Sequence, residues 1–420
     1  MLRKTIPIVA ALALSASGAL IAGSPAQAGP TAGSLALAQT PTRFALSASG
    51  YGSRVVGGNV MAGSDRSAFS IIGCTNLAGL DRSNAEAAVN LGDVHLSGVK
   101  THQWTRLVNG TVSSYSQSYI ANVNLANTAT SHLYLSGVSS TSRAWHNGTG
   151  FHASTRTHLA SIVLNVAGVK TTFPVPTPGN SIRVPGIANI TLNKGTNRVT
   201  AHSALARVDA VKLHVDATNS DVYLAHSRAR IQDGVRSALF HGSAYSTKVN
   251  AAQGRVTSGP TPFIVMPCNG TKGKIVTRSI AHANLGNPIS ADGLTVSQRG
   301  RYVNGHPDAF ERAAVAGVSL TNNLHVNAVV ARAHVIKTST GYHKDTGGTS
   351  TARVYYNGRR ISIPSSGVLT IPGVAKIQSN IVKRTKRGIE ITGLRVSLLT
   401  GDLSVVNIAH AKVSLSPSGL

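Results

Sequence analysis

The stretch Phe69-Ser-Ile-Ile-Gly-Cys74-Thr-Asn76 returns later in the chain as Phe263-Ile-Val-Met-Pro-Cys268-Asn-Gly270. The chain has two cysteines, and each version of this stretch holds one of them. A second matching pair lies further along each copy, Ile182-Arg-Val-Pro-Gly-Ile-Ala-Asn-Ile190 and Leu369-Thr-Ile-Pro-Gly-Val-Ala-Lys-Ile377. Because the matches recur in the same order, the 420 residues contain an internal duplication.

The pattern between these matches is typical of β-strands. Apolar residues alternate with polar ones in stretches such as Val94-His-Leu96 and Ile162-Val-Leu164-Asn-Val166, and Asn-Gly pairs supply turns. No stretch of about ten residues beyond residue 28 has the 3.6-residue periodicity of a helix. We therefore expect an all-β chain with two tandem, duplicated antiparallel β-sandwich-like domains, residues 49–235 and 240–416. A β-solenoid-like fold is the alternative, since units of roughly 30 residues recur within each copy.

The N-terminal residues have the features of an export signal. Arg3 and Lys4 precede an apolar stretch, and Ala26 and Ala28 occupy the small-residue positions that a signal peptidase needs. We expect residues 1–28 to be removed, residues 29–48 to be a flexible mature N-terminus, and no membrane span to remain after cleavage. The expected location is extracellular, with retention at the cell wall as one outcome.

The two cysteines are expected to pair. An exported thiol meets an oxidising environment, and Cys74 and Cys268 occupy matching positions in the two copies. A Cys74–Cys268 disulfide would join the copies at corresponding points. The alternative is one buried free thiol in each domain core.

The charge points to polyanions as partners. The formal net charge is +26, and the excess of Lys and Arg is spread over both copies. Such a charge attracts anionic cell-wall polymers and acidic polysaccharides, although it also serves to keep a surface soluble. The densest basic run, Lys383, Arg384, Lys386 and Arg387, is expected in a hairpin turn as a polyanion contact, with the run 194–198 at the same place in the first copy. No aromatic residue flanks the basic run, so a specific nucleic-acid partner is not expected.

Nothing in the sequence assembles a catalytic centre. The 16 histidines lack the close spacing of metal ligands, and structural hydrogen bonding within sheets is the favoured explanation for them. Asp209, Asp216 and Asp221 are the nearest thing to an acidic cluster. We expect no catalytic residue, no metal and no cofactor, and therefore a non-enzymatic binding or coating protein. A secreted hydrolase acting on a wall or extracellular polysaccharide is the alternative.

Several stretches resemble the choice-of-anchor P family of exported actinobacterial proteins. They are 49–55, Ile72-Gly-Cys74-Thr-Asn76, Phe173-Pro-Val-Pro-Thr177, Val265-Met-Pro-Cys268-Asn-Gly270-Thr271 and Ile371-Pro-Gly-Val-Ala-Lys376. The resemblance implies an exported ectodomain and assigns no biochemical role. Residues 413–420 contain no sorting pentapeptide, apolar span or basic tail, so release from the cell or charge-mediated retention at the wall is expected. The sequence leaves the oligomeric state open.

Overall fold

A computed structural model describes residues 39–57, 66–91, 93–128, 130–251, 257–286, 288–350, 353–399 and 404–418. Within these ranges the chain is all-β, as predicted, and every pairing between neighbouring strands is antiparallel. The expected signal peptide, residues 1–28, lies outside the described residues. The strands form four open sheets, two in each copy, so the antiparallel sandwich prediction is confirmed and the solenoid alternative is not what the chain adopts.

The first lobe consists of two sheets. Sheet I has the order β10-β11-β13-β14-β1-β2, with β12 also paired to β13, and sheet II has the order β3-β4-β5-β6-β8-β9, with β7 also paired to β6. The strands of sheet I are β1 (Thr40–Gly57), β2 (Ser70–Ala78), β10 (Ser181–Val184), β11 (Ala188–Leu192), β12 (Thr196–Thr200), β13 (Ser203–Val215) and β14 (Ser220–Gln232). Those of sheet II are β3 (Asp81–Leu91), β4 (Val94–Val108), β5 (Thr111–Thr128), β6 (Ser131–Asn147), β7 (Gly150–His158), β8 (Ser161–Val166) and β9 (Val169–Phe173).

The second lobe repeats this plan. Sheet III has the order β24-β25-β26-β27-β15-β16, and sheet IV has the order β17-β18-β19-β20-β22-β23, with β21 also paired to β20. The strands of sheet III are β15 (Ala238–Ala251), β16 (Thr257–Val265), β24 (Val368–Ile371), β25 (Ala375–Thr385), β26 (Gly388–Leu398) and β27 (Ser404–Pro417). Those of sheet IV are β17 (Val276–Gly286), β18 (Ile289–Val303), β19 (His306–Ser319), β20 (Leu324–Thr338), β21 (Gly341–Asp345), β22 (Arg353–Tyr356) and β23 (Arg359–Ile361).

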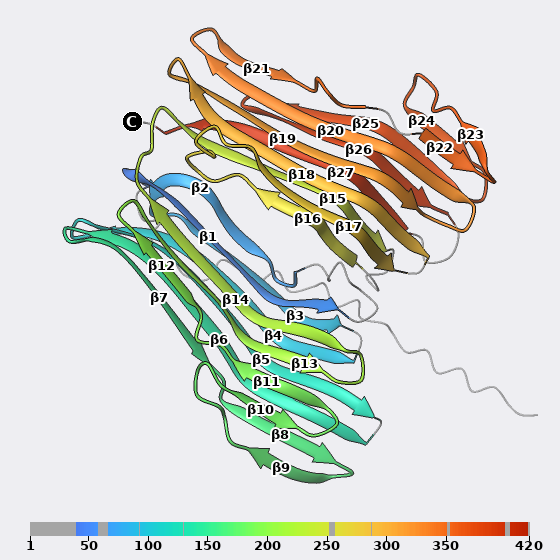
Figure 1. The fold of residues 1–420 in the computed structure, drawn as a ribbon. Helices are drawn as coiled ribbons and strands as arrows, with labels where there is room; N and C mark the ends of the chain where they lie inside the picture. The colour runs from blue at the N-terminus through green and yellow to red at the C-terminus, as the bar shows by residue number, and fades with distance from the viewer. Residues whose placement is uncertain are drawn as a thin grey trace, which may run out of the picture. The chain divides into compact units, whose positions relative to one another are not determined.

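The strand orders match one to one between the copies. Sheet I becomes sheet III and sheet II becomes sheet IV when β1 is equated with β15, β2 with β16, and so on through β14 with β27. One difference is that the single strand β25 corresponds to β11 and β12, which residues 193–195 separate. Figure 1 shows the long strands of each lobe running side by side. The internal duplication is thus present in the topology as well as in the sequence.

Each lobe has an apolar core between its two sheets. In the first lobe Leu213 and Leu224 of sheet I lie in one buried cluster with Ile120 and Leu135 of sheet II. In the second lobe residues of sheets III and IV, among them Ile408 and Leu294, share a single cluster. Burying these alternate residues is what fixes the register, because a shift of one residue would turn each apolar set outward.

The structure corrects one expected boundary. Strand β1 begins at Thr40, and Phe44 and Leu46 within it are buried, so residues 40–48 are not a flexible terminus. The missed signal is the alternation of Phe44, Leu46 and Ala48, which places three apolar side chains on one face of a strand. The first lobe therefore starts about nine residues earlier than the sequence suggested.

The strand ladders are interrupted at matching places. Gly98 in β4, Gly137 in β6 and Gly293 in β18 have φ angles of 61°, 59° and 57°, and Ala225 in β14 and Ala409 in β27 adopt the same left-handed region. The register passes from Ser97–Asn122 to Val99–Ile120, so Gly98 and Ala121 are left out of the β4–β5 ladder. A Cβ atom added to Gly98 would lie 2.8 Å from the Ala121 Cβ. These interruptions therefore depend on small residues.

Candidate functional sites

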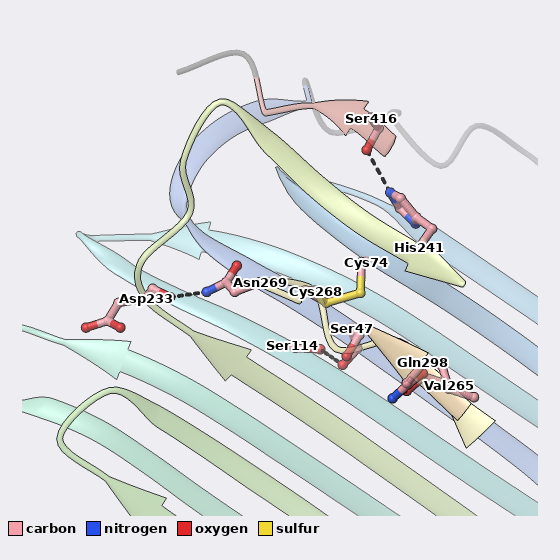
Figure 2. Close-up of a disulfide and its surroundings, with 10 residues drawn as sticks. All are labelled: Ser47, Cys74, Ser114, Asp233, His241, Val265, Cys268, Asn269, Gln298 and Ser416. Atoms are coloured by element: carbon pink, nitrogen blue, oxygen red, sulfur yellow. Dashed lines mark hydrogen bonds between the residues drawn. A yellow bond between two sulfur atoms is a disulfide. The ribbon is translucent and has the colours of Figure 1, made fainter. Parts of the chain in front are cut away.

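The disulfide predicted from sequence is present. Cys74 of β2 and Cys268, which follows β16, are bonded, and their Cα atoms lie 5.2 Å apart. Ala45, Val235 and Leu239 pack with the two cysteines in a small apolar cluster. Figure 2 shows the disulfide with the nearby hydrogen bond from the Asn269 amide to the Asp233 carbonyl oxygen. The bond therefore joins the two lobes at matching positions of the duplicated sequence.

The basic run forms a hairpin turn, as predicted. Residues 386 and 387 connect β25 to β26, and the side chains of Lys383, Arg384, Lys386 and Arg387 are exposed. The Lys344 ammonium donates hydrogen bonds to the carbonyl oxygens of Thr385, at 2.9 Å, and Lys386, at 3.4 Å. Among the carboxylates that the structure describes, none lies within 4.0 Å of the four basic side chains. The turn is thus a positively charged tip.

The expected counterpart in the first copy is wrong. Residues 194–198 lie at the break between β11 and β12 and in β12 itself, whereas the turn equivalent to 386–387 is formed by residues 201 and 202. Residues 193–195 separate β11 from β12 where the second copy has the single strand β25, and this break shifts the alignment of the two copies. The two lobes therefore do not carry matching basic tips.

The histidines act as hydrogen-bonding side chains within the sheets. The Nδ1 atoms of His226, His214 and His282 lie 2.8, 2.9 and 2.6 Å from oxygens of Asp209, Asp221 and Asp292 respectively. His334 lies between Asp308 and Asp345, with 2.7 and 2.6 Å contacts. Within the described ranges no three His, Cys, Asp or Glu side chains are arranged to hold a metal ion.

The three acids singled out from the sequence do not converge. Asp216 pairs with Arg183 at 2.8 Å, and Asp221 pairs with Lys212 at 2.9 Å and with His214. Asp209 instead belongs to a buried row across sheet I that includes His226 and Tyr51. A hydrolase with paired carboxylates needs two acids facing one substrate bond, and each of these three acids has its own separate partners.

The buried row repeats in both lobes with one change. In the first lobe the Tyr51 and His226 rings stack at 4.3 Å, and the Tyr51 hydroxyl donates to Asp209 Oδ1 at 3.0 Å. In the second lobe Tyr245 stacks on His410 at 4.6 Å, and Thr392 Oγ1, 3.0 Å from His410 Nδ1, takes the place of the carboxylate.

Burial decides the protonation of this row. Burial lowers the pKa of His226, and it lowers the pKa of His410 to about 4, so both imidazoles are neutral at pH 7. Burial and the neighbouring Asp209 raise the pKa of Tyr51. The hydrogen bonds of the described residues give the Nε2 atom of His226 no hydroxyl or thiol partner, so the Asp209–His226 pair lacks a nucleophile. We interpret the row as structural.

Two hollows occupy matching positions on sheets II and IV. The first, of about 530 Å³, is lined by Asn90, His95, Ser97, Asn122, Tyr134 and Ser136. The second, of about 380 Å³, is lined by Asp292, Ser319, His325, Asn327 and Tyr355. Both lie directly beside the interrupted ladders, because Ser97 and Asp292 precede the left-handed Gly98 and Gly293.

The two hollows contain the same kinds of side chain, but two of these side chains come from different strands in the two lobes. The cross-strand pair Tyr134–Val163 corresponds to His325–Tyr355, so the phenol ring has moved from β6 to the strand equivalent to β8. Likewise the pair Asn122–Ser136 corresponds to Gly317–Asn327, so the amide has moved to the neighbouring strand. Each hollow thus has a tyrosine, a histidine, an amide and hydroxyl groups, which together suit the hydroxyls and apolar face of a sugar ring.

The sequence reasoning missed the hollows. Their residues are scattered over four strands, and single Tyr, His and Asn residues on the polar face of a strand carry no motif. Only the register of the strands brings them together.

The comparisons with known protein families and with curated proteins found no relative of this chain. No model of a known protein family matches the chain, and no curated protein matches it either. In the described part of the chain, no helix has the length and apolar character needed to cross a membrane.

Proposed function

We propose that this protein is exported and acts outside the cell as a non-enzymatic protein that binds or coats an anionic cell-wall polymer or acidic polysaccharide. The exposed basic turn at Lys383, Arg384, Lys386 and Arg387 carries the proposal, because four positive charges lie at one tip without a carboxylate within 4.0 Å in the described residues. The resemblance to the choice-of-anchor P family is part of this proposal.

Two further features support it. An inter-lobe disulfide is typical of proteins that function in an oxidising compartment. The paired hollows offer amide, hydroxyl and ring groups that suit the sugar units of such a polymer. These groups favour a charged polysaccharide or glycopolymer as partner.

The test is retention on isolated cell walls at increasing salt. We expect the protein to bind at low ionic strength and to be released as salt rises, because exposed charges are screened over about 8 Å at physiological ionic strength. Replacing Lys383, Arg384, Lys386 and Arg387 by Gln should weaken retention about tenfold.

The matched control removes four exposed charges that are dispersed over the first lobe, at Arg82, Arg156, Lys170 and Arg198. This variant has the same net charge as the turn variant and should lose much less affinity. Absence of retention at low salt, or equal losses in the two variants, would contradict the proposal.

A further inference from the structure

We propose that Arg207, Arg228 and Arg230, on the outer face of sheet I, form a binding site for a tetrahedral oxyanion, the phosphate or sulfate group of an extracellular polymer. The choice of a polymer as the natural ligand rests on the proposed function, while the site itself rests on the geometry of sheet I.

The strand register places the three arginines next to one another. Arg207 of β13 lies directly opposite Arg228 of β14, and Arg230 follows two residues later on the same face of β14. On the other side of β14, Ser49 of β1 lies opposite Arg228 and Ser47 lies opposite Arg230. The alternate residues Ala206 and Ala229 are fully buried in the lobe, so the arginines point to the opposite, outer face.

No acid in the described residues forms an ion pair with this cluster. Asp209, two residues from Arg207 on β13, lies close enough for the Arg207 charge to lower its pKa, but its carboxylate accepts hydrogen bonds from His226 and Tyr51. In the described residues no carboxylate oxygen forms an ion pair within 4.0 Å of the three arginines. Like charges directly opposite each other in a sheet are destabilising. Consistent with this crowding, burial and the neighbouring Arg230 and Arg207 lower the pKa of Arg228 to about 10, which still leaves it charged at pH 7.

The second lobe has an ion pair at the positions equivalent to Arg207 and Arg228. Glu390 and Lys412 lie opposite each other at the places of Arg207 and Arg228, and their Oε2 and Nζ atoms are 3.4 Å apart. One copy therefore has an ion pair where the other has two arginines. In the first lobe no carboxylate takes the place of Glu390 opposite the arginine of β14. An external anion would supply the missing negative charge.

The chemistry of the cluster selects the ligand. A guanidinium group donates paired hydrogen bonds to oxyanions, and it loses less hydration than an ammonium group on binding. Three neighbouring guanidinium groups can donate to more than two oxygens, which suits a phosphate or sulfate better than the two oxygens of a carboxylate. Arg207 is exposed and Arg228 and Arg230 are half-buried, so an anion can reach them at a partly desolvated site.

The experiment measures the affinity of the full chain for fluorescently labelled polyphosphate, dextran sulfate and polygalacturonate. We expect the phosphate and sulfate polymers to bind more tightly than the carboxylate polymer. Arg207→Glu should weaken phosphate and sulfate binding at least about tenfold, because the new carboxylate pairs with Arg228 as Glu390 pairs with Lys412. The melting temperature of this variant should stay the same or rise, because the like-charge pair becomes an ion pair.

Two variants serve as controls. Arg156→Glu makes the same change in net charge at an exposed position of sheet II and should retain most of the affinity. Arg230→Gln removes one guanidinium without adding a charge and should give a smaller loss of affinity for the phosphate and sulfate polymers. It tests the site independently if the Arg207→Glu protein does not fold. Unchanged phosphate and sulfate affinity in Arg207→Glu and Arg230→Gln, or equal losses in Arg156→Glu, would overturn the proposal.

The readouts separate this site from the proposed function. If polyphosphate binding depends on Arg207 but the protein is not retained on cell walls, the oxyanion site stands and the wall function fails. If the protein is retained on walls through the basic turn but the Arg207 and Arg230 variants bind every polymer normally, the wall function stands and this site is wrong.

Discussion

At the scale of the residue, the two lobes differ most clearly at Glu311, a buried acid whose equivalent in the first lobe is a serine. It lies on β19 inside the second lobe with no exposed surface, and neither carboxyl oxygen has a hydrogen-bond partner in the described residues. The equivalent residue in the first lobe is Ser116, whose hydroxyl donates to the Ser49 carbonyl oxygen at 2.9 Å. Gly242 lies against the Glu311 side chain, and a Cβ atom there would collide with it.

This burial predicts a pH-dependent stability. Burial raises the pKa of Glu311 well above its usual value of 4.5. The folded state therefore holds a proton that the unfolded state releases, and the free energy of unfolding should fall as pH rises from about 4.5 through the raised pKa. Glu311→Gln should remove this fall and stabilise the protein by about 1–3 kcal/mol at pH 8, measured by urea unfolding between pH 5 and 9.

Glu390→Gln is the matched control, because Glu390 is partly exposed and pairs with Lys412. It should keep the fall in stability at high pH, because the buried Glu311 is still present in this variant. A Glu311→Gln protein with the same pH profile as the unchanged protein would show that the carboxyl group is hydrated or paired in solution.

At the scale of the strand, the interrupted ladders are the feature that positions the hollows. Gly98, Gly137 and Gly293 all hold the left-handed conformation in mid-strand, and an added Cβ at each would lie 2.7–2.9 Å from the Cβ of an alanine on a neighbouring strand or loop. The hollows lie next to these points in both lobes. The glycines are therefore needed for sheet geometry and, through it, for the candidate sugar site.

Gly98→Ala is expected to destabilise the protein by about 2–4 kcal/mol, the sum of the left-handed backbone cost and the steric conflict with Ala121. Gly110→Ala is the control, since Gly110 has a φ of 74° but an added Cβ meets no atom within 4 Å. It should cost only the backbone term of about 1–2 kcal/mol. Chemical unfolding measures both, and adding Ala121→Gly to Gly98→Ala should recover the difference between them.

The hollows yield a binding prediction at the same scale. Tyr134→Ala combined with Tyr355→Ala should reduce wall retention at every salt concentration at which the unchanged protein still binds, because ring contacts do not depend on the screened charges. The expected loss is about tenfold, close to 1.4 kcal/mol. Tyr119→Ala is the control, because Tyr119 is 40% exposed on β5 of sheet II but does not line the hollow. Equal retention by the double variant and the control would exclude the hollows from binding.

At the scale of the whole molecule, the disulfide is the covalent link between the duplicated units. The bonded cysteines are 194 residues apart in sequence. Closing so long a loop restricts the unfolded chain, so replacing both cysteines by serine should lower the free energy of global unfolding by up to about 5 kcal/mol. The two cores are separate, so each lobe should keep its β-structure by circular dichroism.

Alkylation followed by mass analysis checks the bond itself. In the oxidised protein neither Cys74 nor Cys268 should react until a reductant is added. Reaction of both thiols without reduction, or unchanged stability in the serine variant, would contradict the predicted role of the link.

Features that depend on local alternation or on a repeated stretch could be predicted from the sequence, whereas exact strand boundaries could not. Alternation of apolar residues predicted the all-β class, and the repeated Cys74 and Cys268 stretches predicted the duplication and the bond. The same alternation marks residues 40–48 as a strand, against the predicted flexible terminus, and residues 193–195 interrupt a strand that is continuous in the second copy, against the predicted counterpart of the basic turn. These are errors of alignment and of element boundaries.

The sequence by itself determined the strand pattern, the two-copy plan, the pairing of the cysteines and the excess of positive charge, because each is a property of neighbouring residues or of a repeated stretch. Only the tertiary structure decided which side chains meet. Arg207 faces Arg228 while Glu390 faces Lys412, and Tyr355 takes the place of Tyr134, because strand register brings together residues that are far apart in the chain. The candidate binding groups follow from that register, which local sequence patterns do not encode.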